Sequence, residues 1–381
     1  MKISVLVPGR LHGFDMAIYF QKLGVLNQLV TGYPVRYVLP FGIKKQYIKS
    51  LYINEIINRT TNFIGIGYPL DFLACEVFDF LASKVIKCDS DVYFIWSSYA
   101  LKTIKILRKK NPKAKIILVR GSAHIEEQER LLKKVTCDKK QINLRIIEKE
   151  LKEYFEADYI TVPSTYAFNT FIEKGFKKEK LFTNFLGVDL NQFPFQPKRE
   201  DKEKIVIGYV GTLSSRKRIN SIINTIARLN DKKDIFELNL TGPIDYKTFN
   251  ASTLKEHNFI TYNGRLDQKE LHRIYWKIDV LILNSIEDGF GMVLLQAMSC
   301  GCSILATTNT GGPDIIKTYE NGIIISAEND SDLKTALEWF YENRFKIPRM
   351  GKISRAISEN GFTWDDFGRR NMEFITKILE D

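Results

Sequence analysis

The sequence has few cysteines and lacks the pairings that would give them a structural role. There are five, none in a CxxC pair: Cys75, Cys88, Cys137, Cys300 and Cys302. An odd, scattered set indicates neither a disulfide framework nor a zinc module, so we expect a reducing compartment. Cys300 and Cys302 lie in a turn of small residues and are interpreted as packing residues.

Long apolar runs are also missing. No segment approaches the ~20 consecutive apolar residues that span a bilayer. The apolar run at residues 3–7 is too short for the core of a signal peptide. We therefore expect any membrane association to be peripheral.

Several catalytic motifs are absent as well. The four histidines form no HxxxH or HExxH pair, no nucleophile elbow is present, and no expected strand runs into GxGxxG. These absences disfavour metal-dependent hydrolases, serine or cysteine hydrolases and dinucleotide oxidoreductases. Nucleic acid is disfavoured as a partner, because no basic segment is interleaved with aromatic residues.

What the sequence does contain is typical of a globular protein. Of its 381 residues, 44% are hydrophobic and 27% are charged, with 23 Gly and 11 Pro. This composition excludes disorder and low complexity. At ~100 to 200 residues per domain, the length predicts two domains.

The net charge of +11 comes from the first half of the chain. Residues 1–185 hold 30 Lys and Arg against 18 Asp and Glu, whereas residues 186–381 hold 26 against 27. One basic group flanks an apolar-periodic stretch over 48–56: Lys44, Lys45 and Lys49. A denser group follows: Lys102, Lys105, Arg108, Lys109, Lys110, Lys113 and Lys115. Two interpretations stand equally, a solvated basic face or a surface for anionic lipid or a phosphate-bearing acceptor.

Short runs rich in Ile and Val alternate with segments of helical period through both halves. The expected strands are 3–7, 92–96, 116–119 and 159–162, then 205–210, 236–241, 259–262, 280–283, 303–306 and 323–325. Such runs, without polar alternation and separated by helical segments, predict a parallel sheet covered by helices on both faces. The predicted fold class is α/β, with one doubly wound sheet in each half.

Residues 187–203 have the composition of a linker, since two prolines are followed by a charged run. The sequence thus predicts a first domain over 1–186 and a second over 204–363. A final helix over 364–380 is long enough to pack back on the first domain. Because ligands of open α/β sheets bind outside the carboxyl ends of the strands, the two domains are expected to face each other across a cleft.

The most informative window is Asn-Ser-Ile-Glu-Asp-Gly-Phe-Gly-Met-Val-Leu-Leu-Gln over 284–296. Glycines at 289 and 291 would free the backbone to approach a ligand, and the amides near Phe290, Gly291 and Met292 open a helix, which suits a phosphate. Asp288 and Gln296 are eight residues apart, so both could face that ligand. A carboxylate beside a phosphate makes sense only if it accepts hydrogen bonds from hydroxyls, which indicates a nucleotide sugar.

This window resembles the signature of family-4-type glycosyltransferases of the GT-B fold (glycosyl transferases group 1), usually E-G-F-G-L-x-x-L-E. The resemblance implies two Rossmann-like domains. It also implies that Asp288, in place of the first Glu, contacts the donor sugar and that Gln296, in place of the second, binds the ribose. Gln can still bond a diol but without a charge-assisted bond. Asp288 is shorter than the usual Glu, and the neighbouring Glu287 could contact the donor sugar in its place, although the Glu287 side chain is expected to point elsewhere.

A second element follows the expected strand over 205–210. Gly211 begins a turn that contains Arg216 and Lys217, which we expect at the start of a helix, where cations add to the positive end of the dipole. An anion would relieve that conflict. The resemblance implies that this pair grips the donor diphosphate, with Thr212 in place of a usual Arg. The alternative is a set of solvated cations.

The resemblance extends over 157–380 and is weak over 1–120. It implies that Arg265 and Leu266 border the base, although a solvated Arg and a core Leu are an almost equal alternative. In the first domain it places Gly13 beside the donor phosphate and His124 near the reacting sugar. A structural role for His124 is equally weighted, and Asp15 could be a helix N-cap.

Taken with the resemblance, these observations predict a glycosyltransferase that moves a sugar from a nucleotide-diphosphate donor, such as a UDP-sugar, to a saccharide or lipid-linked acceptor. Retention of configuration and a role in surface polysaccharide, lipopolysaccharide or glycolipid synthesis are implied. No cofactor and no metal are expected, since cations and the helix dipole would neutralise the leaving group. The expected location is the cytoplasm or the cytoplasmic face of the membrane. The alternatives are a nucleotide-sugar-binding subunit without catalysis, or an epimerase, phosphorylase or synthase of the same fold.

Overall fold

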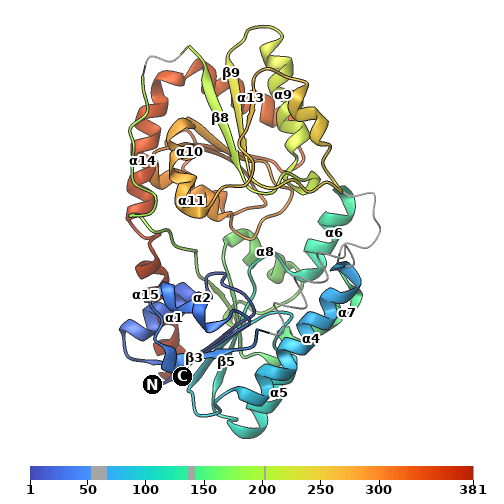
Figure 1. Cartoon of the computed structure of the whole chain (residues 1–381), viewed down its shortest axis with the longest axis vertical. Helices are drawn as coiled ribbons and strands as arrows, with labels where there is room; N and C mark the ends of the chain where they lie inside the picture. Colours follow the sequence, from blue (N-terminus) through green and yellow to red (C-terminus); the bar gives the residue numbers. More distant parts are fainter. Residues whose placement is uncertain (53–66, 136–141, 201–202, 381) are drawn as a thin grey trace.

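The computed structural model describes residues 1–52, 67–135, 142–200 and 203–380. It consists of two α/β lobes, each with one parallel sheet, as the sequence predicts (Figure 1). The first sheet has seven strands in the order β3-β2-β1-β4-β5-β6-β7. Their bounds are β1 Ile3–Val7, β2 Leu26–Thr31, β3 Ile48–Ser50, β4 Val92–Trp96, β5 Lys115–Val119, β6 Tyr159–Val162 and β7 Leu181–Thr183.

The second sheet has six parallel strands in the order β10-β9-β8-β11-β12-β13. Their bounds are β8 Ile205–Val210, β9 Phe236–Thr241, β10 Ile260–Tyr262, β11 Val280–Leu283, β12 Ser303–Thr307 and β13 Gly322–Ile325. In both sheets the strand order reverses beside the first strand, at β1/β4 and at β8/β11. Ligands of open α/β sheets bind at such switch points, at the carboxyl ends of the strands.

Helices cover both faces of each sheet, which explains why the strands are apolar without alternation: every residue of β1, β4, β11 and β12 is buried. The helices of the first lobe are α1 Gly13–Lys22, α2 Val35–Val38, α4 Gly67–Val85, α5 Leu101–Lys110, α6 Ile125–Val135, α7 Leu144–Glu156 and α8 Thr165–Glu173. Those that follow β8 are α9 Ile219–Asn230, α10 Leu271–Lys277, α11 Met292–Ser299, α12 Gly312–Ile315, α13 Asp330–Glu342, α14 Ile347–Glu359 and α15 Trp364–Glu380. None of these helices is long and apolar enough, within the described residues, to cross a membrane.

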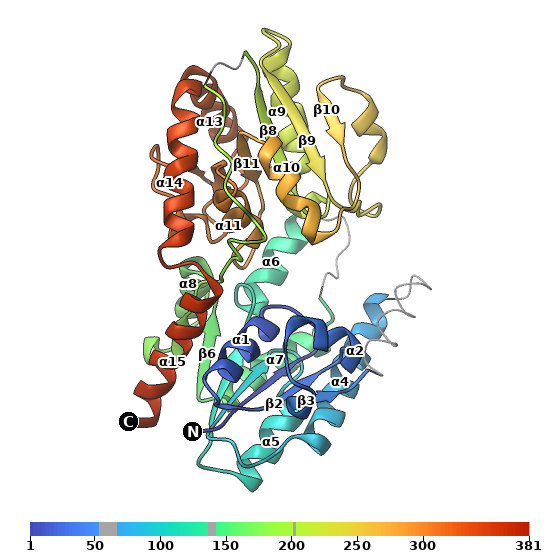
Figure 2. The same cartoon turned by 60° about the vertical axis from the view of Figure 1, so that its left-hand side comes forward.

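Helix α15 returns to the first lobe and lies along it (Figure 2). A Cβ on Gly368 would overlap the ring of Tyr19 on α1, and Phe374 stacks on Phe182 of β7 with ring centroids 4.1 Å apart. The chain therefore passes between the lobes twice, and the two passages touch. The amide of Val188 donates to the carbonyl of Phe362 at 2.8 Å.

Two local interpretations of the sequence differ from the structure. The stretch after Lys44 forms a 3₁₀ turn (Lys45–Tyr47) and the edge strand β3, and residues 53–56 of that stretch lie outside the described residues. Arg216 and Lys217 do not open α9. They lie in a 3₁₀ turn (Ser215–Lys217), and Arg218 then takes a left-handed conformation, φ 51°, before α9 begins.

Candidate active site

The candidate site lies where β8 and β11 end, at the switch point of the second sheet. The two strands pair directly, so their following loops start side by side. The loop after β8 carries Arg216 and Lys217, and the loop after β11 carries Glu287 and Asp288. The amide of Ile286 donates to the carbonyl of Arg216 at 3.0 Å, which ties the two loops together.

These loops bring four charged side chains into contact, here called the four-charge cluster: Arg216, Lys217, Glu287 and Asp288. Lys217 Nζ is ion-paired with Asp288 Oδ2, and Arg216 Nη1 lies 3.3 Å from Glu287 Oε2. Burial raises the pKa of Asp288, but Lys217 and Arg216 outweigh it and hold that pKa below its usual value. The carboxylate is therefore ionised at neutral pH, and the cluster is formally neutral.

Both cations have partners within the protein. Arg216 and Lys217 precede α9 rather than open it, and they pair with Glu287 and Asp288. A diphosphate at this site would therefore have to compete with two carboxylates for the cations.

The glycines of the loop after β11 have two different roles. Gly291 has φ 82° and immediately precedes α11, and a Cβ there would overlap Leu283. A Cβ on Gly289 would overlap the carbonyl oxygen of Gly121 in the first domain, and the Ser164 hydroxyl donates to the Gly289 carbonyl at 2.6 Å. Gly289 therefore permits close approach of the first domain, whereas the sequence suggested approach to a ligand.

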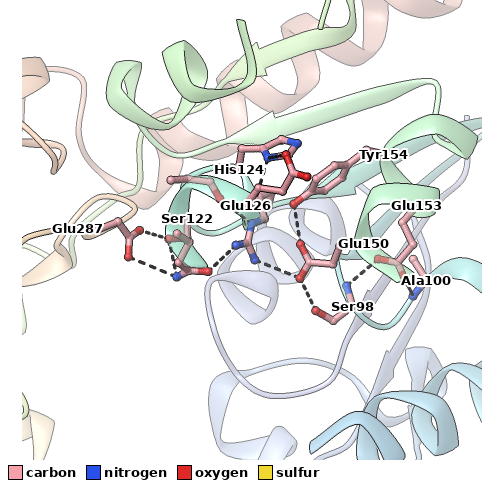
Figure 3. Close-up of polar contacts among 12 residues, drawn as sticks. Ser98, Ala100, Ser122, His124, Glu126, Glu150, Glu153, Tyr154 and Glu287 are labelled. Carbon is pink, nitrogen blue, oxygen red and sulfur yellow. Dashed lines mark hydrogen bonds and ion pairs between the residues drawn. The ribbon is translucent and has the colours of Figure 1, made fainter. Parts of the chain in front are cut away.

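Glu287 points toward the first domain, and Figure 3 shows its partners there. Its carboxylate accepts hydrogen bonds from the Ser122 hydroxyl and, at 3.3 Å, from Gln128 Nε2. Both partners follow β5, in the segment that also contains His124. The sequence signal for them was their place after the end of a buried strand.

Gln296 lies elsewhere, in a cavity of about 430 Å³ between the domains. Its side chain is 6% exposed, and its Oε1 accepts a hydrogen bond from the Tyr275 hydroxyl at 2.9 Å. Met292 lines the same cavity. The ribose role of Gln296 stays a prediction.

Residues of the first domain and the linker line this cavity too, among them Arg10, Asp15 and Asp189. Arg10 Nη1 donates to Gln268 Oε1 at 2.9 Å across the domains. Asp15 lies in the first turn of α1 rather than at its N-cap, which is His12, and burial raises its pKa to about 6. Sequence reasoning missed Arg10 and Gln268, because contacts between loops 258 residues apart leave no local signal.

Five other predicted site residues have well-defined local surroundings. A Cβ on Gly13 would lie 2.9 Å from Val7 Cβ, so this glycine is needed for packing on the sheet. Gly211 has φ 147° at the end of β8. Arg265 is exposed and Leu266 packs against the core, and the contact of this pair with the base stays a prediction. Phe290 is buried, 2% exposed, at the start of the glycine turn.

His124 does not face the cleft. It is 1% exposed and packs among the rings of Tyr154, Phe171 and Phe176. Burial lowers its pKa to about 4, so the ring is neutral at pH 7. These surroundings differ from those expected beside the reacting sugar, and we do not include His124 in the donor site.

The basic group at 102–115 lies on and after α5, which runs from just beyond β4 to the end of the first lobe farthest from the second (Figures 1 and 2). Lys102 pairs with Glu76 and Arg108 with Asp158. None of the seven basic residues, all within the described part of the chain, lines the cavity between the domains.

Part of the chain matches a known family. Residues 191–364 match the family described as glycosyl transferases group 1. The chain is 22% identical over 244 residues to a GDP-mannose-dependent monoacylated alpha-(1-6)-phosphatidylinositol monomannoside mannosyltransferase of Corynebacterium glutamicum, covering 59% of this chain and 62% of that protein. It is 24% identical over 192 residues to a D-inositol 3-phosphate glycosyltransferase of an Arthrobacter species, covering 47% and 45%. The chain thus spans about half of the length of the curated relatives it matches.

Solved structures match over nearly the whole chain. The Anabaena protein Alr3699/HepE, crystallised with UDP, has a TM-score of 0.69 at 15% identity, covering 99% of this chain and 100% of that one. The apo form of the lipopolysaccharide outer core galactosyltransferase WaaB has a TM-score of 0.72 at 17% identity, covering 99% of both. At these identities the likeness establishes the fold, which is GT-B.

Proposed function

Because the chain belongs, through residues 191–364, to the glycosyl transferases group 1 family, we propose that it transfers a sugar from a nucleotide-diphosphate donor to a saccharide or lipid-linked acceptor. The proposal rests mainly on one observation. Two cations and two carboxylates from the loops after β8 and β11 meet at the switch point of the second sheet, facing the first domain.

In this proposal Arg216 and Lys217 bind the donor diphosphate. Lys217 is the better placed to exchange partners, since a diphosphate offers a compact ammonium more charge than the single carboxylate of Asp288 does. As the bond from sugar to phosphate breaks, charge grows on the leaving diphosphate. The two cations and the first amides of α11, near Gly291 and Met292, would stabilise it.

Asp288, released by Lys217, would then accept hydrogen bonds from the hydroxyls of the sugar. A carboxylate is a strong acceptor for such hydroxyls, and Arg216 nearby still favours its charged form. Gln296 would contact the ribose from the cavity that it lines with Met292. Arg265 and Leu266 would border the base. Retention of configuration and independence from metal are part of the proposal.

The acceptor side is proposed on more general grounds. The curated relatives named above are a lipid-directed mannosyltransferase and an inositol phosphate glycosyltransferase, and WaaB acts on lipopolysaccharide outer core by its name. A saccharide or lipid-linked acceptor in surface polysaccharide or glycolipid synthesis agrees with them. For its location, we propose the cytoplasm, with the basic residues of α5 in contact with an anionic membrane.

A panel of UDP- and GDP-sugars, scored by mass spectrometry for nucleotide release with saccharide acceptors, tests the activity. Titration calorimetry with UDP and GDP tests the site. Lys217→Ala is expected to weaken nucleotide binding several-fold, because a charge-assisted phosphate contact contributes ~1.5 to 3 kcal/mol and Lys217 gives up Asp288 to form it.

The matched control is Lys232→Ala, which removes an exposed lysine in the turn after α9, away from the strand ends that carry the site. Unchanged affinity in Lys217→Ala would contradict the diphosphate role. If the chain binds nucleotide sugars but releases no nucleotide with any acceptor of the panel, a non-catalytic nucleotide-sugar-binding subunit is favoured. Gln296 in place of a carboxylate is compatible with that alternative.

A further inference from the structure

Glu287 joins the two domains, and its contacts reach the cation that the proposed function assigns to the diphosphate. We propose that Glu287 is a positioning residue that couples closure of the domains to the availability of Arg216. When the domains close, Ser122 and Gln128 share the Glu287 carboxylate, so Glu287 holds Arg216 only at 3.3 Å and gives it up more readily to the donor diphosphate. The coupling to nucleotide rests on the proposed function, whereas the closure itself does not.

The burial of Glu287 is the first support. Its side chain is 0% exposed, and a buried carboxylate is tolerable only when hydrogen-bonded. Among the residues that the structure describes, Glu287 has three side-chain donors: Ser122 and Gln128 belong to the first domain, and Arg216 belongs to its own. The carboxylate is therefore fully satisfied only in the closed arrangement.

The orientation of Gln128 is the second support. Arg120 Nη2 donates to Gln128 Oε1 at 2.6 Å, and because a guanidinium can only donate, the amide oxygen must face it. The NH₂ group is thereby directed at Ser122 Oγ, 3.1 Å away, and at Glu287. Arg120 is itself anchored in the first domain by Glu150, 3.2 Å away (Figure 3).

The geometry of Arg216 is the third support. Its contact with Glu287 is 3.3 Å, long for a charge-assisted hydrogen bond, and its side chain is 37% exposed. The closed arrangement thus leaves Arg216 loosely held and accessible. Opening removes Ser122 and Gln128, so Glu287 would draw Arg216 into a tighter pair and away from a diphosphate.

The sharpest test replaces the amide of Gln128 with a carboxylate. Gln128→Glu sets a negative charge against Glu287 without changing the size of the side chain. We expect the radius of gyration from small-angle X-ray scattering, measured without ligand, to increase, and the dissociation constant for UDP to rise about tenfold. Lys134→Ala is the matched control. It removes another ion pair between the domains, to Glu328 at 3.4 Å, but an exposed one, and neither quantity should change.

A second substitution separates this coupling from general damage. Adding Glu287→Gln to Gln128→Glu restores one amide and one carboxylate at the contact, in exchanged positions. We expect the radius of gyration and the dissociation constant for UDP to return toward their original values. Gln128→Ala, at a half-buried position on α6, provides a milder variant whose folding can be checked by circular dichroism.

Either of two outcomes in the single variant Gln128→Glu would overturn the proposal: an unchanged radius of gyration, or an open form that binds UDP as tightly as the parent. A double variant as open as Gln128→Glu alone would also overturn it. If the parent chain binds no nucleotide, the proposed function fails, while scattering still decides whether Glu287 closes the domains.

Discussion

The ion pair between Lys217 and Asp288 gives a prediction whose size can be worked from the structure. Lys217→Met removes the ammonium and keeps an apolar stem of similar length. Removing one partner of a fully buried pair costs about 3 to 5 kcal/mol, and of an exposed pair about 0 to 1 kcal/mol. The Lys217 side chain is 9% exposed and that of Asp288 25%. With Arg216 still nearby, we expect a loss of about 2 kcal/mol in the free energy of unfolding.

The assay is a double-mutant cycle with Asp288→Asn, followed by urea unfolding. Each single variant leaves one buried charge unpaired, whereas the double variant leaves none. The double variant should therefore lose about 2 kcal/mol less than the sum of the single variants. Strictly additive losses would refute the view that the pair is a coupled, buried unit.

The same pair predicts a change in pH dependence. In the parent chain the pKa of Asp288 is lowered, so its contribution to stability is present at neutral pH and is lost as pH falls through that pKa. Without Lys217, burial of Asp288 acts with less opposition and should raise its pKa. The free energy of unfolding that Lys217→Met loses relative to the parent chain should then become smaller as pH falls from about 7 to 5. A deficit that grows over this range would contradict the assignment of charges.

Three further outcomes are expected. Gln296→Glu should tighten donor binding in calorimetry, since a carboxylate bonds a ribose diol more strongly; no change would leave the ribose contact misassigned. Gly289→Ala should increase the radius of gyration, because a Cβ there overlaps the Gly121 carbonyl, whereas Gly121→Ala, whose Cβ meets nothing within 4 Å, should not. Burial raises the pKa of Glu153 to about 8. The folded state therefore binds a proton that the unfolded state releases, and stability should fall from pH ~5 to ~8. In Glu153→Gln, the free energy of unfolding measured in urea should decrease less over this pH range. An equal decrease in the variant and the parent would contradict the raised pKa of Glu153.

The sheets could be predicted from the sequence because their signal is local. Runs such as Ile205–Val210 and Phe236–Thr241 are apolar throughout most of their length, and their bounds in the structure are those expected. Strand β2 was not predicted, because Asn27 and Gln28 interrupt its apolar run. These side chains bond to Asp89 and to the carbonyl of Val85, contacts that no local pattern reveals.

The candidate site was predictable in part for a similar reason. Arg216, Lys217 and Asp288 follow strand ends and could be placed at one edge of a sheet. Their mutual neutralisation could not be predicted, since it depends on which side chains meet across loops 71 residues apart. Two of the partners of Glu287, Ser122 and Gln128, come from the other domain, and Ser122 lies 165 residues away in the chain.

Helix α15 has a consequence for how the chain is made. Its partners on the first lobe, Tyr19 on α1 and Phe182 on β7, are synthesised long before Gly368 and Phe374 exist to cover them. During translation the ribosome must release all of β8 to α14 before this apolar surface is closed. The first lobe can thus bury this surface only after the second lobe has been synthesised, and a nascent chain that stops before Trp364 leaves it exposed.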